Sequence, residues 1–552
     1  MQIVPVTLAL AAVLALLFGG PSTPQSAPER QPRAQPARTL PPGSLFATAD
    51  QCMACHNNLA SPSGRDISIG YEWRSSMMAN AARDPYWHAG VRREVLDHPE
   101  AADAIQHECS ACHMPMMRYE AKVNGQMGQV FAHLPVTTAA GQSTPSLLAA
   151  DGVSCAVCHQ IGKEKLGTKD SFAAGFVVDT SLAPGQRRVF GPYLVDNGRA
   201  RVMRSASTFS PTEAAHIQSS EVCATCHTLF THTLGPGGKA IGELPEQVPY
   251  LEWRHSAYPK EKSCQACHMP VEEGVAISSV LGQPRPHLAR HEFRGGNFFM
   301  PMMLNRYRNE LGVTALSQEL DATARHAIET LETESARLSV DRAGLRDGTL
   351  TAVVAIENLA GHKLPTAYPS RRAWLHVTVR DGNGRAVFES GAFSPDGSIS
   401  GNDNDADASR FEPHYAEIRS AGQVQVYESV MVDQQGAVTT GLLHGIRYVK
   451  DNRILPRGFD KTTAEKDVAV QGDAAADPDF VGGGDRVRYV VDVGRAEGPF
   501  QVQAELRYQS IGYRWAKNVQ RDAPESTRFV RYYDSMASAS SATLAKAAVT
   551  VR

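Results

Sequence analysis

The chain has little excess charge of either sign. Its 55 Lys and Arg residues nearly balance its 58 Asp and Glu residues and leave a formal net charge of −3. No nucleic acid is therefore expected as a partner, because a polyanion is usually bound by a strongly basic surface. Beyond residue 20 the chain also lacks any apolar run long enough to span a bilayer.

Cysteine is absent outside one repeated pattern. All 10 cysteines belong to five copies of Cys-x-x-Cys-His, so none is left over for a disulfide or a free thiol. The copies are Cys52-Cys55-His56, Cys109-Cys112-His113, Cys155-Cys158-His159, Cys223-Cys226-His227 and Cys264-Cys267-His268. A single copy could be a redox or zinc-binding cysteine pair, but five complete copies indicate c-type haem attachment. The sequence therefore predicts five covalently bound haems, each with the motif histidine as proximal iron ligand.

The sixth ligand of each iron decides whether a haem carries electrons or is open for catalysis. The motif region holds more histidines than the five haems require, so only some of them are expected to be ligands. The candidate distal ligands are His133, His216, His232, His291, His362 and Met78. His216 and His232 flank the fourth motif, and His133 is the one histidine between the second and third motifs.

The case for His291 depends on a predicted helix. Pro286 would begin this helix and Gly295-Gly296 would end it, which places His287 and His291 on one face. His362 lies in the Pro-containing turn 361–366, where a distal ligand and a solvated surface residue are both compatible with the sequence. Arg371 and Arg372 follow, and either guanidinium could pair with a haem propionate.

An internal repeat supports the Met78 candidate. Glu72-Trp73-Arg74-Ser75-Ser76 returns as Glu252-Trp253-Arg254-His255-Ser256, and each copy precedes a motif that continues as Met-Pro. Met78 and Tyr258 occupy the same position after the repeated Trp in the two copies, and a thioether ligand at Met78 would raise the potential of its haem. The alternative is that both side chains only pack.

The chain divides into five segments by composition and periodicity. Residues 1–20 resemble a signal peptide or a membrane anchor, and the Pro-rich residues 21–43 form a linker. Residues 44–310 form a pentahaem domain with short helices and irregular segments, and residues 311–340 form a linking helix with apolar positions on one stripe. Residues 341–552 form a β-sandwich. The predicted fold class is therefore α+β and multidomain, with a haem-organised N-terminal domain and an all-β C-terminal domain.

The β prediction depends on alternation and on turn residues. Residues 375–379 lead into the turn Asp381-Gly382-Asn383-Gly384, which favours a hairpin. Residues 424–432, 487–493 and 500–508 are also β-rich, and the last of these segments places apolar side chains on one face. Asp403 to Asp407 resemble the start of a calcium loop, but Ala408 and His414 replace the required Gly and Glu, so calcium is not expected.

Several of these segments resemble exported multihaem cytochromes c. The resemblance lies in the Trp-Arg-x-Ser repeats, the sequences around the third and fourth motifs, His291-Glu292-Phe293-Arg294-Gly295-Gly296-Asn297, and residues 450–456. The chain is distantly similar to the tetrahaem cytochrome of nitrifiers and to hydroxylamine oxidoreductase. This resemblance implies periplasmic haem attachment, closely stacked haems, electron transfer, and distal ligands at His216 and His291.

Two functions follow from these observations. The first is an exported pentahaem cytochrome that carries electrons between redox protein partners, with a donor or acceptor at the membrane. The alternative is a redox enzyme that acts on a small nitrogen or sulfur compound at one open haem. No Lys-bearing motif variant marks a reductase centre, and no oligomeric state is predicted. Periplasmic or otherwise exported localisation is expected, with anchoring by residues 1–20 as an open alternative.

Overall fold

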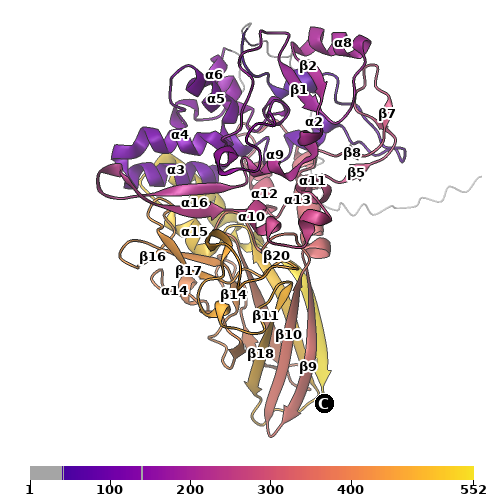
Figure 1. The fold of residues 1–552 in the computed structure, drawn as a ribbon. Coiled ribbons are helices and arrows are strands. Elements are labelled where there is room, and N and C mark those ends of the chain that lie inside the picture. The colour runs from indigo at the N-terminus through magenta and orange to yellow at the C-terminus, as the bar shows by residue number, and fades with distance from the viewer. Residues whose placement is uncertain (1–39, 41–42, 138–140) are drawn as a thin grey trace, which may run out of the picture. The chain divides into compact units, whose positions relative to one another are not determined.

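The structure is a computed structural model that describes residues 40, 43–137 and 141–552, and these residues form a mixed α and β protein (Figure 1). The predicted leader or anchor at residues 1–20 and nearly all of the predicted linker at 21–43 lie outside the described residues. Within the described part, no helix combines the length and the apolar character that a bilayer crossing requires.

Short helices dominate the segment that contains the motifs. They are α1 (Ala49–Met53), α2 (Ile69–Arg74), α3 (Pro85–Asp97), α4 (Ala102–His113), α5 (Pro115–Val123), α6 (Thr144–Ala150), α7 (Cys155–Cys158), α8 (Asn197–Ser207), α9 (Ser220–Ala224), α10 (Pro249–Arg254), α11 (Cys264–His268) and α12 (Phe299–Arg306). Four two-stranded sheets lie among them: β1 (Arg188–Gly191) with β2 (Ser210–Glu213), β3 (Leu229–Leu234) with β4 (Ala240–Gln247), β5 (Val271–Glu272) with β8 (Leu288–Ala289), and β6 (Val275–Ala276) with β7 (Pro284–Arg285).

The predicted helix at residues 286–296 is wrong. Residues 284–289 instead form β7 and β8, which pair with β6 and β5. His287 has a positive φ of 56°, a conformation that no helix interior adopts. His287 and His291 therefore do not share a helix face, and the side chain of His287 is 75% exposed beside Glu273.

Beyond the motifs the chain forms α13 (Ser317–Glu334) and then changes to strands. The apolar stripe predicted for this helix is buried, with Leu320, Ala324, Ala327 and Leu331 facing the core. The helix is shorter than the predicted span of 311–340, because β9 begins at Ala336 and pairs along its length with β10.

Two larger sheets form most of the C-terminal part. One has the order β13 (Glu417–Ile418), β18 (Gly484–Asp492), β10 (Thr349–Asn358), β9 (Ala336–Arg346). The other has the order β12 (Ala386–Ser390), β11 (Arg372–Arg380), β19 (Phe500–Gln509), β20 (Ser541–Val551), and β14 (Val426–Tyr427) also pairs with β11. A third sheet contains β16 (Val438–Thr439), β15 (Ser429–Val432) and β17 (Arg447–Asp451). The helices here are α14 (Asp403–Ala406), α15 (Tyr513–Asn518) and α16 (Pro524–Met536).

The strand predictions are confirmed in this part of the chain, but the all-β prediction for residues 341–552 is wrong, because α14, α15 and α16 lie among the strands. β11 and β12 form the expected hairpin around the turn at residues 381–384. β19 buries Phe500, Val502, Ala504, Leu506 and Tyr508, the alternating set expected from the sequence. The segment at 424–432 is divided into β14 and β15, which pair with different strands.

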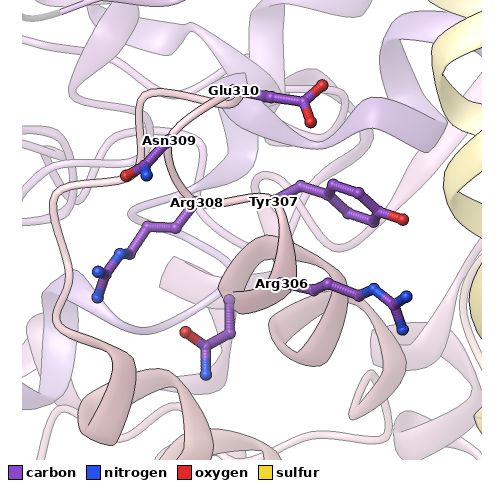
Figure 2. A pocket seen from close by; sticks show the side chains of 6 residues that line it. Arg306, Tyr307, Arg308, Asn309 and Glu310 are labelled. Atoms are coloured by element: carbon purple, nitrogen blue, oxygen red, sulfur yellow. The ribbon is translucent and has the colours of Figure 1, made fainter. Parts of the chain in front are cut away.

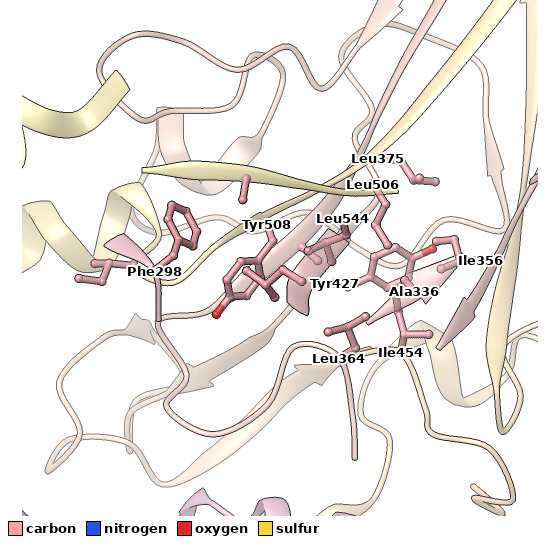
Figure 3. Close-up of a cluster of buried hydrophobic side chains, with 14 of the residues drawn as sticks. Phe298, Ala336, Ile356, Leu364, Leu375, Tyr427, Ile454, Leu506, Tyr508 and Leu544 are labelled. Carbon is pink, nitrogen blue, oxygen red and sulfur yellow. The ribbon is translucent and has the colours of Figure 1, made fainter. Parts of the chain in front are cut away.

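The helical and β parts share one buried apolar core. Phe298, at the N-terminal end of α12, packs with Tyr508 of β19, and their ring centroids lie 6.4 Å apart (Figure 3). Leu364, from the turn after β10, belongs to the same cluster. Each buried aromatic or leucine side chain contributes roughly 1.5–3 kcal/mol to folding. The C-terminal sheets are therefore fixed to the helical part by side chains that are fully buried.

A second connection joins α3 to α16. Asp84 caps α3 by accepting hydrogen bonds from the N–H groups of Tyr86 and Trp87. Further along the helix, Arg92 pairs with Glu525 at 2.9 Å, and Asp97 pairs with Arg521 at 2.8 Å. These contacts orient the helix that precedes the second motif against the C-terminal part.

Candidate haem centres

Each of the five motifs contains a helical turn. Cys52 lies in α1, Cys109 and Cys112 in α4, Cys155 and Cys158 in α7, Cys223 in α9, and Cys264 and Cys267 in α11. Residues three apart on a helix lie on one face, so both thiols of a motif can reach the same porphyrin edge. None of the 10 cysteines forms a disulfide. The motifs thus have the local geometry that thioether attachment requires.

Thiols from different motifs lie next to one another. The neighbouring thiol of Cys52 raises the pKa of Cys155, and the thiols of Cys226 and Cys264 raise the pKa of Cys112 and Cys223 in the same way. The sulfur of Cys112 lies 4.0 Å from the carbonyl oxygen of Cys226. The first motif therefore borders the third, while the fourth borders both the second and the fifth.

Backbone carbonyls hold four of the motif histidines by Nδ1. The imidazole N–H of His113 donates to Ala81 at 2.9 Å and that of His159 to Phe190 at 2.6 Å. His56 donates to Ile277 at 2.5 Å, and His268 donates to Arg294. A hydrogen bond at Nδ1 fixes the ring and leaves Nε2 as the free nitrogen, which is the arrangement expected of a metal-binding histidine.

The ring of His159, in the third motif, faces the ring of His291. Their centroids lie 6.3 Å apart and their planes differ by 19°. Imidazole nitrogens bind a transition metal at about 2.0–2.1 Å, so two rings on opposite sides of one metal have centroids about 6–6.5 Å apart. The separation in this structure therefore fits one iron between His159 and His291.

His268, in the fifth motif, faces His362 with the same geometry. The ring centroids are 6.2 Å apart and the planes differ by 14°. Nδ1 of His362 donates to the carbonyl of Lys363 at 2.9 Å, so its Nε2 is free. The sequence left open whether His362 is a ligand or a solvated residue, and the structure places it, half-buried, beside a motif histidine.

Burial keeps these imidazoles neutral. It lowers the pKa of His291 to about 3, and it lowers the pKa of His113 and of His227 to about 4. The pKa of His362 is lowered by the same cause. Only a neutral imidazole offers a lone pair to a metal, so these groups are ready to bind one at physiological pH.

The remaining candidate ligands form no close ring pair with a motif histidine among the described residues. His232 is half exposed near Glu108, with 3.7 Å between Nδ1 and a carboxylate oxygen. Nδ1 of His133 is 3.1 Å from the hydroxyl of Ser146, and Nε2 of His216 is 2.8 Å from the carbonyl of Ile161. Among the described residues, the close ring pairs that join a motif histidine to another histidine are the two given above, and Met78 is half-buried.

Two neighbours of the motifs were missed or misassigned from the sequence. Trp87 stacks on His113 with centroids 4.3 Å apart and planes within 2°. Arg372 does not face a motif, because it is buried and pairs with Asp405 at 2.7 Å. Arg371 lies close enough to His227 to lower its pKa and remains the propionate candidate of the two.

A separate buried cluster contains His414, Asp477 and Asp485, whose ligand atoms all lie within 4.8 Å of one another. Nδ1 of His414 accepts hydrogen bonds from the amides of Gln425 at 2.8 Å and Asn452 at 3.1 Å. Nε2 must then carry the proton, which it donates to Asp477 at 3.1 Å. A protonated nitrogen cannot bind a metal, so the residues do not fit an ion here.

This cluster predicts a pH effect on stability. Burial raises the pKa of Asp485 to about 7, against the opposing hydrogen bond from Tyr427. An unfolded aspartate titrates near pH ~3.9, so the folded protein binds more protons between these values, and its stability falls as the pH rises from about 4 to about 7. In urea titrations, Asp485→Asn is expected to flatten this dependence relative to the wild type. Equal slopes for both proteins would contradict it.

An open hollow lies away from these centres, in the loop after α12. Figure 2 shows its lining, which consists of Asn305, Arg306, Tyr307, Arg308, Asn309 and Glu310. Tyr307 stacks on Tyr532 with centroids 3.6 Å apart, and Glu310 pairs with Arg531 at 2.6 Å. The hollow contains neither cysteine nor histidine, and its charged side chains already connect α12 to α16.

No protein-family model and no curated protein matches the chain. Among solved structures, it is similar to the crystal structure of a penta-heme cytochrome c552 from Thermochromatium tepidum. The TM-score is 0.48 and the sequence identity is 15%, over 92% of this chain and 100% of that chain. The haem centres of this chain are therefore assigned from its own five motifs and from its histidine geometry.

Proposed function

We propose that the protein is an exported multihaem c-type cytochrome that binds five haems covalently and carries electrons between redox protein partners. The observation that carries this proposal is the pair of facing histidines at the third and fifth motifs, with centroids 6.3 and 6.2 Å apart. At these two centres, two imidazoles per iron would leave no position for a substrate, which suits electron transfer. Haem supplies single-electron chemistry when it is bound.

The chain's own residues support this role in three ways. The cysteines would attach the porphyrins, and His56, His113, His159, His227 and His268 would be the proximal ligands. His291 and His362 would be the distal ligands of the third and fifth centres. The neighbouring thiols of different motifs bring the centres close to one another, which short-range electron transfer requires.

A second function is favoured by the surroundings of His113. Trp87 stacks on this ring, and no other histidine ring faces it among the described residues. The second centre could therefore hold an open iron at which a redox enzyme acts on a small nitrogen or sulfur compound. The number of five-coordinate irons distinguishes this function from electron transfer.

Protein matured in a host that attaches haem is expected to gain the mass of five haems. Intact mass spectrometry measures this number, and fully matured protein with four or fewer haems would contradict it.

Electron paramagnetic resonance of the ferric protein should show low-spin signals from the third and fifth centres. A high-spin signal assigned to the second centre would favour the enzyme, whereas low-spin signals from all centres would favour the electron carrier.

A further inference from the structure

The internal repeat occupies equivalent places in α2 and α10. Glu72 and Glu252 each lie in a short helix and are buried, with 6% and 0% of their surface exposed. Trp73 and Trp253 follow them directly. A buried carboxylate must accept hydrogen bonds from nearby donors, because its desolvation otherwise costs several kcal/mol. The donors that bond to each glutamate therefore show which backbone segment the carboxylate holds in place.

Glu72 holds the segment that carries His291. One carboxylate oxygen accepts a hydrogen bond from the backbone N–H of His291 at 2.9 Å. The other accepts from Nε of Arg290 at 2.7 Å. Both donors come from the loop after β8, so the carboxylate fixes the backbone at the residue whose ring faces His159.

Glu252 holds the segment that carries His362 in the same way. One oxygen accepts from the backbone N–H of Lys363 at 3.1 Å and from the hydroxyl of Thr366 at 2.5 Å. The other oxygen lies 2.8 Å from Nη1 of Arg453. In both glutamates, one carboxylate oxygen accepts a hydrogen bond from a backbone N–H at or beside the facing histidine. The other oxygen pairs with an arginine.

The tryptophans hold the opposite side of the same two centres. The indole N–H of Trp73 donates to the carbonyl of Val153 at 3.0 Å, two residues before Cys155. The indole N–H of Trp253 donates to the carbonyl of Lys262, also at 3.0 Å and two residues before Cys264. The first copy thus serves the third motif, not the second motif that follows it in the sequence.

We infer that each Glu-Trp pair is a positioning device for one haem centre. The glutamate fixes the backbone at or beside the distal histidine. The tryptophan fixes the loop segment that immediately precedes the Cys-x-x-Cys-His motif of the same centre. Glu72 and Trp73 serve the centre of His159 and His291, while Glu252 and Trp253 serve the centre of His268 and His362. This inference rests on the proposed function, because it assumes that those histidines bind iron.

The test compares Glu72→Gln with Glu252→Gln in the full-length, haem-loaded protein. Glutamine keeps the shape but replaces one accepting oxygen with an amide NH2 group, which must face either the backbone N–H or the arginine, and both of these are donors. Glu72→Gln should remove or shift the low-spin resonance that His291→Ala removes, and Glu252→Gln should affect the resonance that His362→Ala removes. After reduction, each variant should bind carbon monoxide at one further haem.

Glu412→Gln is the matched control. Glu412 is 1% exposed and accepts a backbone N–H from Asp403 at 2.9 Å and the hydroxyl of Tyr415 at 2.7 Å, yet it lies in the C-terminal part away from the motifs. It should leave all resonances unchanged. If a glutamate variant does not accumulate, Trp73→Phe and Trp253→Phe keep an aromatic ring at each position and remove the indole N–H, and they should shift the same two resonances.

The possible outcomes separate the two claims. If His291→Ala and His362→Ala open an iron while the Gln and Phe variants retain the wild-type resonances and carbon monoxide binding, the positioning role is wrong and the haem assignment stands. If the histidine variants leave the spectrum unchanged, the assigned centres are wrong and the positioning role fails with them. The inference would also be overturned if Glu72→Gln affected the resonance that His362→Ala removes, and Glu252→Gln affected the resonance that His291→Ala removes.

Discussion

Replacing His362 with alanine is expected to open the iron of the fifth centre. His362 faces His268 at 6.2 Å between ring centroids, and its Nδ1 is already engaged by the carbonyl of Lys363. Loss of this imidazole leaves the sixth coordination position free. The reduced variant should bind carbon monoxide at one haem more than the wild type does, as measured by the difference spectrum.

His255→Ala is the control for this prediction. His255 lies near the same centre, but its ring contacts Phe459 and its Nδ1 is 2.8 Å from the carbonyl of Leu251. Its removal should leave carbon monoxide binding unchanged. If His255→Ala opens the iron and His362→Ala does not, then His255 is the ligand. His362→Met should keep the iron six-coordinate and raise its potential, because a thioether ligand favours the ferrous state.

The second large effect is expected from Asp451→Ala. Asp451 is buried between two cations, with 2.7 Å to Nζ of Lys363 and 2.8 Å to Nη2 of Arg453. Burial opposes its ionisation, but Arg453 and Lys363 outweigh this effect and hold the pKa of Asp451 below its usual range. Removal of the carboxylate leaves Lys363 buried without its ion-pair partner and leaves Arg453 with Glu252 alone, and breaking such a buried ion pair costs about 3–5 kcal/mol of unfolding free energy.

Urea denaturation followed by far-ultraviolet circular dichroism measures this loss. Asp534→Ala is the control, because Asp534 is 51% exposed and pairs with Lys517 at 2.6 Å on the surface. Such a pair contributes about 0–1 kcal/mol. Equal midpoints for Asp451→Ala and the wild type would show that the buried cations find other partners. Lys363 adjoins His362, so Asp451→Ala should also disturb the fifth centre.

The parts of the site that lie within one local segment could be predicted from the sequence. Each Cys-x-x-Cys-His motif needs only one helical turn, so its geometry follows from spacing alone. The alternation of β19 and the apolar stripe of α13 are equally local, and both are present in the structure.

The predictions that failed concern segments whose conformation depends on contacts with distant parts of the chain. A helix was predicted for residues 286–296 from a proline, two histidines and two glycines. The chain there pairs instead with β5 and β6, and His287 takes a positive φ. Strand pairing across a loop leaves no periodic signal in segments of two residues, so tertiary contacts decided the conformation.

The repeat illustrates the same limit differently. Its two copies were recognised in the sequence, but the haem centres that they contact were not. The structure connects Trp73 to Val153 and Glu72 to His291, which are distant in the chain. Similarly, Arg371 and Arg372 are neighbours in sequence, yet Arg372 turns into the β core to meet Asp405. Local patterns identified the residues but not their partners.

As the proposed distal ligand, His362 would set an order of assembly for the fifth centre. The last Cys-x-x-Cys-His motif ends at His268, so all five motifs are synthesised before His362. A chain interrupted before residue 362 would carry all five attachment sites and a fifth iron with one free position. Occupation of that coordination position by His362 would therefore require that the C-terminal sheets are complete and docked. Binding of a small ligand to the fifth iron would then distinguish unfinished chains from finished ones.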